Sequence, residues 1–164
     1  ALNLPDFRSA ERTFNLLTQV AGRAGRSDLG GRVIIQSYTP QHYSIQAAKN
    51  HDYNTVYDKE ISLRKELYLP PFCHMASLTL RGRKEERVFR TSENLKASIE
   101  EENKSKNIEI LGPAPSPISK MKGMYRWNIF LRSETIENII PILKKALDKN
   151  KSSGIIVTVD VDPY

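Results

Sequence analysis

The chain has 164 residues, 39% of them apolar, and 25 Lys plus Arg against 19 Asp plus Glu give a formal net charge of +6. Apolar residues spread along the whole chain exclude collagen-like and extensively disordered proteins, and the length suits one domain or a small domain with an appendage. No run approaches the roughly 18 apolar residues that cross a bilayer, so no membrane partner is expected. The single cysteine, Cys73, excludes an internal disulfide and the usual cysteine-based zinc site, and it favours a reducing cytoplasm. The excess of positive charge indicates a polyanionic partner, and the start at Ala1, without Met, indicates a piece of a longer protein.

Three helices and a strand are predicted in the first part of the chain. Apolar residues at three- and four-residue spacing predict a helix over Ser9–Ala21, and an apolar run behind two glycines predicts a buried strand over Val33–Tyr38. Thr39-Pro40 is typical of a helix start, because the N–H that proline lacks would be unpaired there anyway. A longer helix is predicted over Asp52–Tyr68, and Pro70-Pro71 ends it.

Beyond Phe72 the pattern is strand, helix, strand, strand, helix, strand. The predicted spans are Met75–Arg81, Lys84–Glu102, Ile108–Leu111, Arg126–Arg132, Thr135–Lys149 and Ile155–Val161, with a proline-rich loop over Gly112–Ile118. This order is that of the split β-α-β unit of ferredoxin-like folds. In this α+β class two helices pack on one face of an antiparallel sheet.

The most specific local pattern is the glycine- and arginine-rich segment from Gln19 to Arg26. If the first helix continues through it, Gln19, Arg23 and Arg26 share one face, while Gly22 and Gly25 remove steric bulk beside them. Guanidinium groups carry planar forks of donors that stay charged, so this face suits a phosphate. The alternative is a solvated helix end, where arginines also suit the negative pole of the helix dipole. Spacing alone leaves both interpretations open.

The pattern Gln-x-x-Gly-Arg-x-Gly-Arg over residues 19–26 resembles motif VI of superfamily 2 helicases. Its setting, from Asp6 to Arg26, resembles the primosomal protein N′ family of bacterial replication-restart DNA helicases. The likeness continues in order along nearly the whole chain, through Val33-Ile34-Ile35-Gln36, His51-Asp52-Tyr53, Tyr68-Leu69-Pro70-Pro71-Phe72, Leu111-Gly112-Pro113-Ala114-Pro115, Tyr125-Arg126-Trp127 and Asp160-Val161-Asp162-Pro163.

The resemblance implies an ATP-dependent helicase that moves 3′ to 5′ on DNA, recognises stalled replication forks and starts primosome assembly for replication restart. Residues 1–50 would be the end of RecA-like α/β helicase lobe 2 with motif VI, residues 51–69 a connecting helix, and residues 70–164 a C-terminal domain similar to ribosomal protein S-ten. ATP, Mg²⁺ and zinc would bind the full-length protein. The Walker A loop and the zinc cysteines are missing from this sequence, so this fragment alone is expected to be inactive.

Site roles and partners follow from the same resemblance. Arg26 would be the arginine finger and Arg23 its companion at the γ-phosphate, with Gln19, Gly22 and Gly25 completing the surface that faces ATP. A finger acts because the charge that develops on the transferred phosphoryl group needs a positive partner. The expected partners are branched or single-stranded DNA, single-stranded-DNA-binding protein and other primosome proteins. A monomer in the bacterial cytoplasm, associated with the nucleoid, is expected.

A second candidate site is the stretch from Ala114 to Arg132, which holds basic and aromatic residues and no acidic one. Such a mixture is typical of a surface that follows a phosphate backbone and stacks bases. The candidate DNA contacts are Lys120, Lys122, Tyr125 and Arg126. Strand alternation favours a core position for Trp127 over a stacking role.

Two other functions stay open from the sequence: a stand-alone RNA- or ribosome-binding module, and a protein-docking domain with no role in ATP hydrolysis. His42, His51 and His74 lack metal-ligand spacing, so no metal site is expected, and Cys73 is expected to be buried. The remaining acidic pair, Asp160 and Asp162, would share a strand face, and the resemblance implies a structural role for this chain end.

Overall fold

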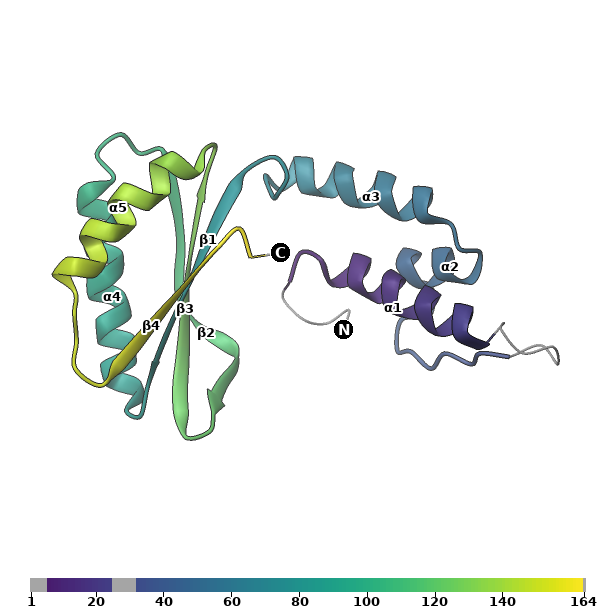
Figure 1. The fold of residues 1–164 in the computed structure, drawn as a ribbon, viewed down its shortest axis with the longest axis horizontal. Helices are drawn as coiled ribbons and strands as arrows, with labels where there is room; N and C mark the ends of the chain where they lie inside the picture. The colour runs from purple at the N-terminus through teal and green to yellow at the C-terminus, as the bar shows by residue number, and fades with distance from the viewer. Residues whose placement is uncertain (1–5, 25–31, 164) are drawn as a thin grey trace. The chain divides into compact units, whose positions relative to one another are not determined.

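The computed structural model describes residues 6–24 and 32–163 (Figure 1). The chain forms two compact units, Ala1–Leu69 and Pro70–Tyr164, each with a hydrophobic core of its own. The described residues form five α-helices and a four-stranded antiparallel sheet, so the chain is of the α+β class. No helix within these described ranges has the length and apolar character needed to cross a membrane.

Three helices make up the first unit: α1 (Ser9–Ala24), α2 (Tyr43–Lys49) and α3 (Tyr53–Glu66). The prediction of a helix from Ser9 is confirmed, and α1 continues three residues beyond its predicted end. α3 confirms the helix predicted over Asp52–Tyr68, with Asp52 as its N-cap: one side-chain oxygen accepts from the Thr55 backbone N–H at 3.1 Å. Side chains from all three helices form one small core, which consists of Phe14, Ala47, Ala48 and Val56 with Leu17 and Tyr43 packed against it.

A network of polar side chains also connects these helices. The Tyr43 hydroxyl in α2 donates to the Glu60 carboxylate in α3, and Arg64, one turn further along α3, donates to Glu60 at 3.2 Å. Arg64 also donates to Glu11 of α1 at 2.9 Å. Because Glu60 is buried, these two donors are what keeps its charge compensated.

Two predictions for the first unit are wrong. Val33–Tyr38 is not a buried strand: the segment has no regular structure, Ile34 is 83% exposed and Tyr38 is fully exposed. A strand exists only when its backbone pairs with another strand, and every strand in the described ranges belongs to the second unit. The helix expected at Thr39-Pro40 begins at Tyr43 instead, because the His42 N–H closes a turn onto the Thr39 carbonyl and the His42 ring caps the helix by accepting from Ser44.

The second unit has the order β1 (His74–Gly82), α4 (Glu85–Glu102), β2 (Ile108–Met121), β3 (Met124–Ser133), α5 (Ile136–Lys149) and β4 (Ile155–Val161). The strands lie in the spatial order β2-β3-β1-β4, and each neighbouring pair is antiparallel. Both helices cover the same face of the sheet (Figure 1). The order of elements predicted from the sequence is therefore confirmed.

The core of this unit lies between the helices and the sheet. Alternate residues of β1 and β3 point into it because side chains of a strand alternate between its faces, and Leu78, Leu80, Ile129 and Leu131 are all fully buried. The helices contribute Val88, Leu95 and Ile99 of α4 and Ile139 and Leu143 of α5 to this core.

One prediction for the second unit is wrong in an informative way. The proline-rich segment Gly112–Ile118 is not a separate loop but part of the long strand β2, whose register against β3 shifts between Leu111 and Ala114 and again between Pro115 and Lys120. Proline cannot donate to a ladder, and it is tolerated at bulges and on edge strands. β2 is an edge strand, so its prolines interrupt the pairing without ending the strand.

Candidate nucleic-acid interface

The helicase-like motif begins in the last turns of α1. Gln19 and Arg23 are exposed and one helical turn apart, so they share a face of the helix, and Gly22 between them is also exposed. A Cβ atom added at Gly22 would meet nothing within 4 Å. Gly25 and Arg26 lie outside the described residues, so the expected convergence of Arg26 with Arg23 stays a prediction.

The second candidate site forms the tip of the β2–β3 hairpin. Lys120 pairs with Tyr125 and Met121 with Met124, which leaves Lys122-Gly123 as a two-residue turn. Both turn residues have positive φ, 49° and 75°, as in the tight turns that match the twist of a hairpin. Glycine, which tolerates positive φ, occupies the second position of the turn, and Lys122 occupies the first.

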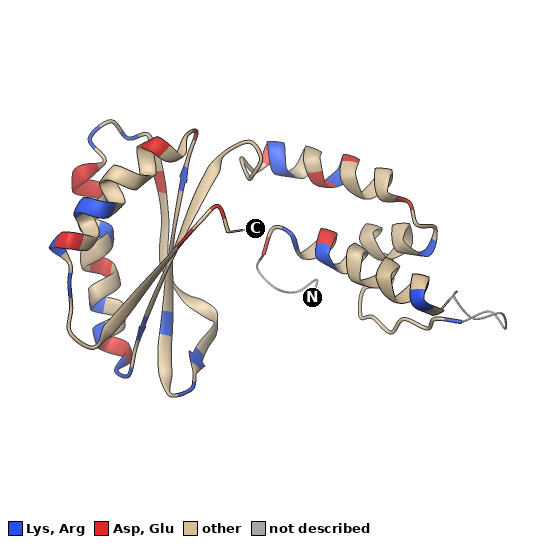
Figure 2. Cartoon of the chain, in the orientation of Figure 1, with Lys and Arg blue, Asp and Glu red and all other residues tan. Residues whose placement is uncertain are grey.

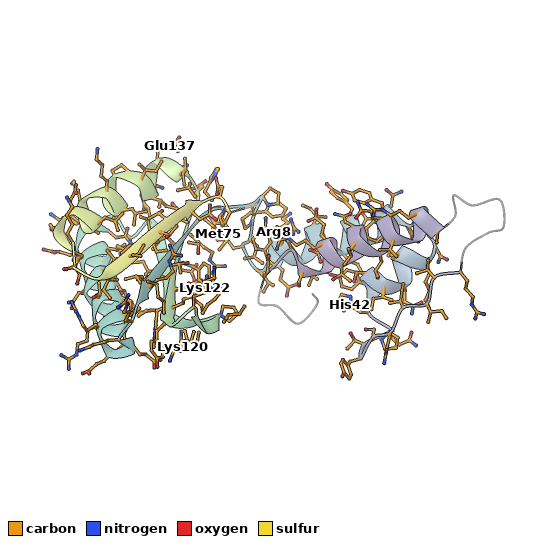
Figure 3. The ribbon with its side chains drawn as sticks, turned by 60° about the horizontal axis from the view of Figure 1, so that its bottom comes forward. Arg8, His42, Met75, Lys120, Lys122 and Glu137 are labelled. Atoms are coloured by element: carbon orange, nitrogen blue, oxygen red, sulfur yellow. The ribbon has the colours of Figure 1, made fainter. Side chains whose placement is uncertain are left out.

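Lys120 and Tyr125 contact each other across this hairpin. The Lys120 ammonium donates to the Tyr125 hydroxyl at 3.2 Å and lies 4.5 Å from the centre of its ring. Lys120 and Lys122 are exposed, and Figure 3 labels both on the hairpin, away from Glu137 at the start of α5. Two exposed cations thus lie together at one end of the second unit, with Lys120 over the ring of Tyr125, which is partly buried against the core.

Trp127 lies on the core side of β3, as the strand alternation predicts, and so does Tyr125. The Trp127 ring packs against Phe89 of α4, with the two ring centres 4.8 Å apart, and it lies against the core. The neighbouring residues in the strand, Arg126 and Asn128, therefore point to the opposite, helix-free face of the sheet.

On this helix-free face the strand registers place side chains in rows that cross β3, β1 and β4. The rows are Arg126, Arg81 and Ile156; Asn128, Thr79 and Thr158; and Phe130, Ser77 and Asp160. The Asn128 side-chain oxygen accepts from Thr79 at 3.1 Å and from Ser116 at 2.8 Å. Because its oxygen is used in this way, Asn128 retains its amide N–H groups as donors on this face.

Arg81 and Arg126 stand directly opposite each other in the first row. Arg81 donates to the Thr158 hydroxyl at 3.0 Å. The Nε atoms of both arginines are buried and donate to no acceptor in the described part of the chain. Like charges opposite each other are destabilising, and an unsatisfied buried donor costs about 1–3 kcal/mol. The arginine pair therefore does not stabilise the folded second unit by itself.

The far end of the same face is different, because its charges are compensated. Arg132 donates to both carboxylate oxygens of Glu109, at 2.8 and 2.7 Å. Asp162 accepts from the His74 ring at 2.8 Å and from the Met75 backbone N–H at 3.0 Å, which gives this chain end the structural role expected of it. Among the described residues, no Asp or Glu forms an ion pair with Arg81 or Arg126. Uncompensated positive charge thus gathers towards the hairpin end (Figure 2).

Sequence reasoning found the hairpin residues and Arg126 but missed Arg81 and Thr158. Strand alternation could have placed Arg81 on a polar face. Its position opposite Arg126, however, depends on the pairing of β1 with β3, 45 residues apart in the chain at this point, and no local pattern encodes that register.

Comparison with known proteins identifies the chain. The family model described as "Primosomal protein N C-terminal domain" matches residues 65–164, well over half of the chain. The chain belongs to this family. It is also 41% identical to the replication restart protein PriA of Bacillus subtilis over 99% of its length, 40% identical to that of Synechocystis over 99%, and 36% identical to that of Thermotoga maritima over 97%.

The primosomal protein N relatives are much longer than this chain. The chain spans 21% of the Bacillus subtilis protein, 19% of the Synechocystis protein and 20% of the Thermotoga maritima protein. It therefore corresponds to the C-terminal part of a replication restart protein.

No metal centre can be built from the described residues, which contain no cluster of three or more His, Cys, Asp and Glu side chains with suitable geometry. The sequence holds one cysteine, so a zinc site with paired cysteines does not fit it. Cys73 is buried, as predicted, and its burial raises the pKa of the thiol.

Proposed function

We propose that the chain is the C-terminal part of an ATP-dependent DNA helicase that moves 3′ to 5′, recognises stalled replication forks and starts primosome assembly. The observation that carries the proposal is the match of 97–99% of the chain to replication restart proteins of three distant bacteria. It works in the bacterial cytoplasm on nucleoid DNA, together with single-stranded-DNA-binding protein and other primosome proteins.

The proposal gives each unit a separate task. Residues 1–50 complete the second helicase lobe, and residues 70–164 form a ferredoxin-like domain similar to ribosomal protein S-ten. Residues 51–69 are the helix that connects the two. The order β2-β3-β1-β4, with two helices on one face, supports the ferredoxin-like assignment. The exposed apolar segment Val33–Tyr38 supports the lobe assignment, because a strand without its neighbours is what a severed sheet leaves.

In this proposal α1 presents motif VI to a nucleotide held by the other lobe of the full-length protein. Bound ATP with Mg²⁺ supplies the phosphoryl group. Arg23 and Arg26 donate to its γ-phosphate and balance the charge that develops there, while Gln19 orients this surface. The exposure of Gln19, Gly22 and Arg23 is consistent with this role.

The test of the arginine finger is DNA-stimulated ATP hydrolysis by a full-length restart protein that carries this C-terminal sequence. Arg26→Ala is expected to lower turnover by about 10³-fold or more while DNA affinity changes little. Arg12→Ala is the matched control, since Arg12 is an exposed arginine of the same helix, near its other end. Wild-type turnover of Arg26→Ala, or an equal loss in Arg12→Ala, would reject the finger assignment.

The C-terminal domain contacts DNA through the hairpin residues Lys120, Lys122 and Tyr125 together with Arg126. Fluorescence anisotropy of the 164-residue chain with fork, single-stranded and duplex DNA across a salt series tests this contact. A double Lys120→Ala, Lys122→Ala variant is expected to bind more weakly with a shallower salt dependence. The control, Lys144→Ala with Lys145→Ala on the exposed side of α5, keeps the same net charge as this variant and is expected to bind like wild type.

Two alternative functions receive less support. A stand-alone RNA- or ribosome-binding module and a protein-docking domain without an ATPase role would both need no helicase motif, whereas the match to restart proteins continues through residues 19–26. Tighter binding to single-stranded RNA than to any DNA in the same titrations would favour the first of them.

A further inference from the structure

The helix-free face of the second unit carries an arginine pair that no motif accounts for. Arg81 of β1 and Arg126 of β3 are cross-strand neighbours, and the described residues offer neither of them a carboxylate. Side chains directly opposite in an antiparallel pair have Cβ atoms about 4.5–5.5 Å apart, so both guanidinium groups can reach one anion. Two like charges held this close are stabilised by an anion that both contact.

Both arginine side chains are partly covered by protein before any ligand arrives. Their Nε atoms are buried, so the base of each guanidinium is already removed from solvent. Arg81 is fixed further by its hydrogen bond to Thr158 at 3.0 Å. An arginine fork that is already ordered loses less side-chain entropy on binding than a flexible one.

The surroundings of the pair favour a phosphate of a nucleic-acid chain. The next row, about 7 Å along the strands, holds the uncharged donors of Asn128 and Thr158 and no acidic residue. In the other direction β3 leads to the hairpin turn, where Lys122 adds a cation. Tyr125 and Lys120 alternate onto the opposite side of the strands, the side on which Trp127 packs. The arginine pair, the uncharged donors of the next row and Lys122 at the turn thus follow one another along the strand direction, an arrangement that suits an extended phosphate backbone.

We propose that Arg81 and Arg126 together bind one phosphate of a single-stranded nucleic acid that runs along β3 over the helix-free face to the hairpin. The proposal rests on the DNA-binding role proposed for this domain and adds to it a defined phosphate site, a direction along the sheet and a residue, Arg81, outside the basic stretch. Thr158 is a positioning residue, since it acts by holding Arg81.

The test is fluorescence anisotropy of the 164-residue chain with a labelled oligothymidylate of about 16 nucleotides, at salt concentrations from about 50 to 200 mM. Arg81→Gln and Arg126→Gln are each expected to weaken binding by about 10-fold at low salt. The double variant is also expected to reduce the slope of log affinity against log salt by about 0.7, the value for one single-strand phosphate contact, and each single variant by less. Because both arginines share one phosphate, the double variant should lose less than the sum of the two.

Conservative variants separate geometry from charge. Arg81→Lys keeps the charge and loses the planar fork, so the salt slope is expected to stay near the wild-type value while affinity falls by a smaller factor than in Arg81→Gln. Thr158→Val is expected to weaken binding without changing the slope, because the charge remains. Thermal unfolding of each variant, followed by the fluorescence of Trp127, shows that the second unit is folded in the binding assay.

The control is Arg90→Ala, which removes an arginine that is 73% exposed on α4, away from this face. A fall in slope and affinity in Arg90→Ala equal to that in Arg81→Gln would overturn the site, because binding would then follow net charge alone. Wild-type affinity and slope in folded Arg81→Gln and Arg126→Gln would also overturn it, while leaving the hairpin contact intact. If the hairpin variants bind like wild type as well, the DNA-binding role of the domain fails too.

An acidic peptide is the competing occupant. Titration with a labelled oligoglutamate distinguishes it: loss of peptide binding in Arg81→Gln with unchanged oligothymidylate binding would overturn the nucleic-acid proposal in favour of a protein tail. We expect the reverse. Arg81→Gln should weaken oligothymidylate binding, and the wild type should bind oligoglutamate only weakly.

Discussion

Asp162, just after β4, accepts a hydrogen bond from the backbone N–H of Met75 at the start of β1, with 3.0 Å between the two atoms. The Asp162 N–H in turn donates to the Met75 carbonyl at 2.7 Å. The residue has φ of 45°, a conformation that Asn and Asp adopt more readily than other residues with side chains. The last residues of the chain are thereby fixed to the first strand of the domain.

This relationship predicts that Asp162→Ala lowers the free energy of unfolding of the second unit by about 2 kcal/mol, since a charge-assisted acceptor for Met75 and His74 is lost. Asp162→Asn keeps an acceptor and tolerates the same φ, so its cost is expected to be about 1 kcal/mol or less. Urea unfolding followed by Trp127 fluorescence measures both. Equal stability of Asp162→Ala and wild type would show that these contacts contribute nothing.

Glycines in two different settings predict opposite effects of alanine. Gly112 has φ of 96°, and a Cβ atom there would lie 2.8 Å from the backbone oxygen of Asn128. Because backbone cannot move aside cheaply, Gly112→Ala is expected to destabilise the second unit by about 2 kcal/mol. Gly22→Ala, on the exposed end of α1 with open space around it, is expected to gain about 0.5–1 kcal/mol through helix propensity.

Circular dichroism during thermal unfolding compares these two variants with wild type. A Gly112→Ala protein as stable as wild type would contradict the close approach of β2 to β3 at this bulge. In the full-length protein Gly22→Ala should still lower ATP turnover if the motif VI surface needs that space.

The Tyr43–Glu60 contact predicts a loss of stability in alkaline solution. Burial, the hydrogen bond to Glu60 and the negative charge of Glu60 raise the pKa of the Tyr43 hydroxyl well above its ordinary value of 10.0. A pKa that is higher in the folded state means that the contribution of Tyr43 is fully present below pH 10.0 and is lost as pH rises towards its folded-state pKa.

The measurement for this prediction is the helical circular dichroism of the chain between pH 9 and 12, beside the absorbance of tyrosinate. Tyr43→Phe should remove part of the alkaline loss, although it is less stable near neutral pH because Glu60 loses a donor. Tyr57→Phe is the control, since Tyr57 is 50% exposed in α3. Identical alkaline curves for wild type and Tyr43→Phe would contradict the assignment.

The buried thiol of Cys73 gives a fourth prediction. Cys73 is 3% exposed and burial raises its pKa, so the thiolate, which is the reactive form, is scarce in the folded chain. Ellman's reagent is expected to react at least about 10-fold more slowly with the native chain than with the chain in denaturant. Equal rates would show that the start of the second unit opens readily.

Most of the second unit could be predicted from the sequence because its elements are amphipathic. β4 has the predicted span Ile155–Val161, in which Ile155, Val157 and Val159 alternate, and Val88, Leu95 and Ile99 lie at helical spacing on the buried face of α4. The prediction of a loop in the proline-rich part of β2 was wrong for a physical reason. A turn-forming composition cannot be distinguished from that of an edge strand with bulges until the pairing partner is known.

In the first unit, too, strand pairing could not be predicted from local sequence. Val33–Tyr38 has the composition of a buried strand, but a strand is a property of two segments, and the described residues contain no partner for it. The chain covers about a fifth of the length of the Bacillus subtilis and Synechocystis relatives, and pairing of this segment with a strand of a longer protein stays a prediction.

For the candidate site, the sequence alone determined the chemistry of the residues: the motif over residues 19–26, the basic and aromatic hairpin, and a net charge of +6. Only the tertiary structure decided which of these charges are compensated and which stand together. Arg132 pairs with Glu109 across two strands, whereas Arg81 and Arg126 are neighbours to which no acid of the described residues is paired. The reason is that the register of an antiparallel pair is set by burial of the opposite face. Packing of Leu80 and Trp127 into the core is what brings the two arginines together on the other side.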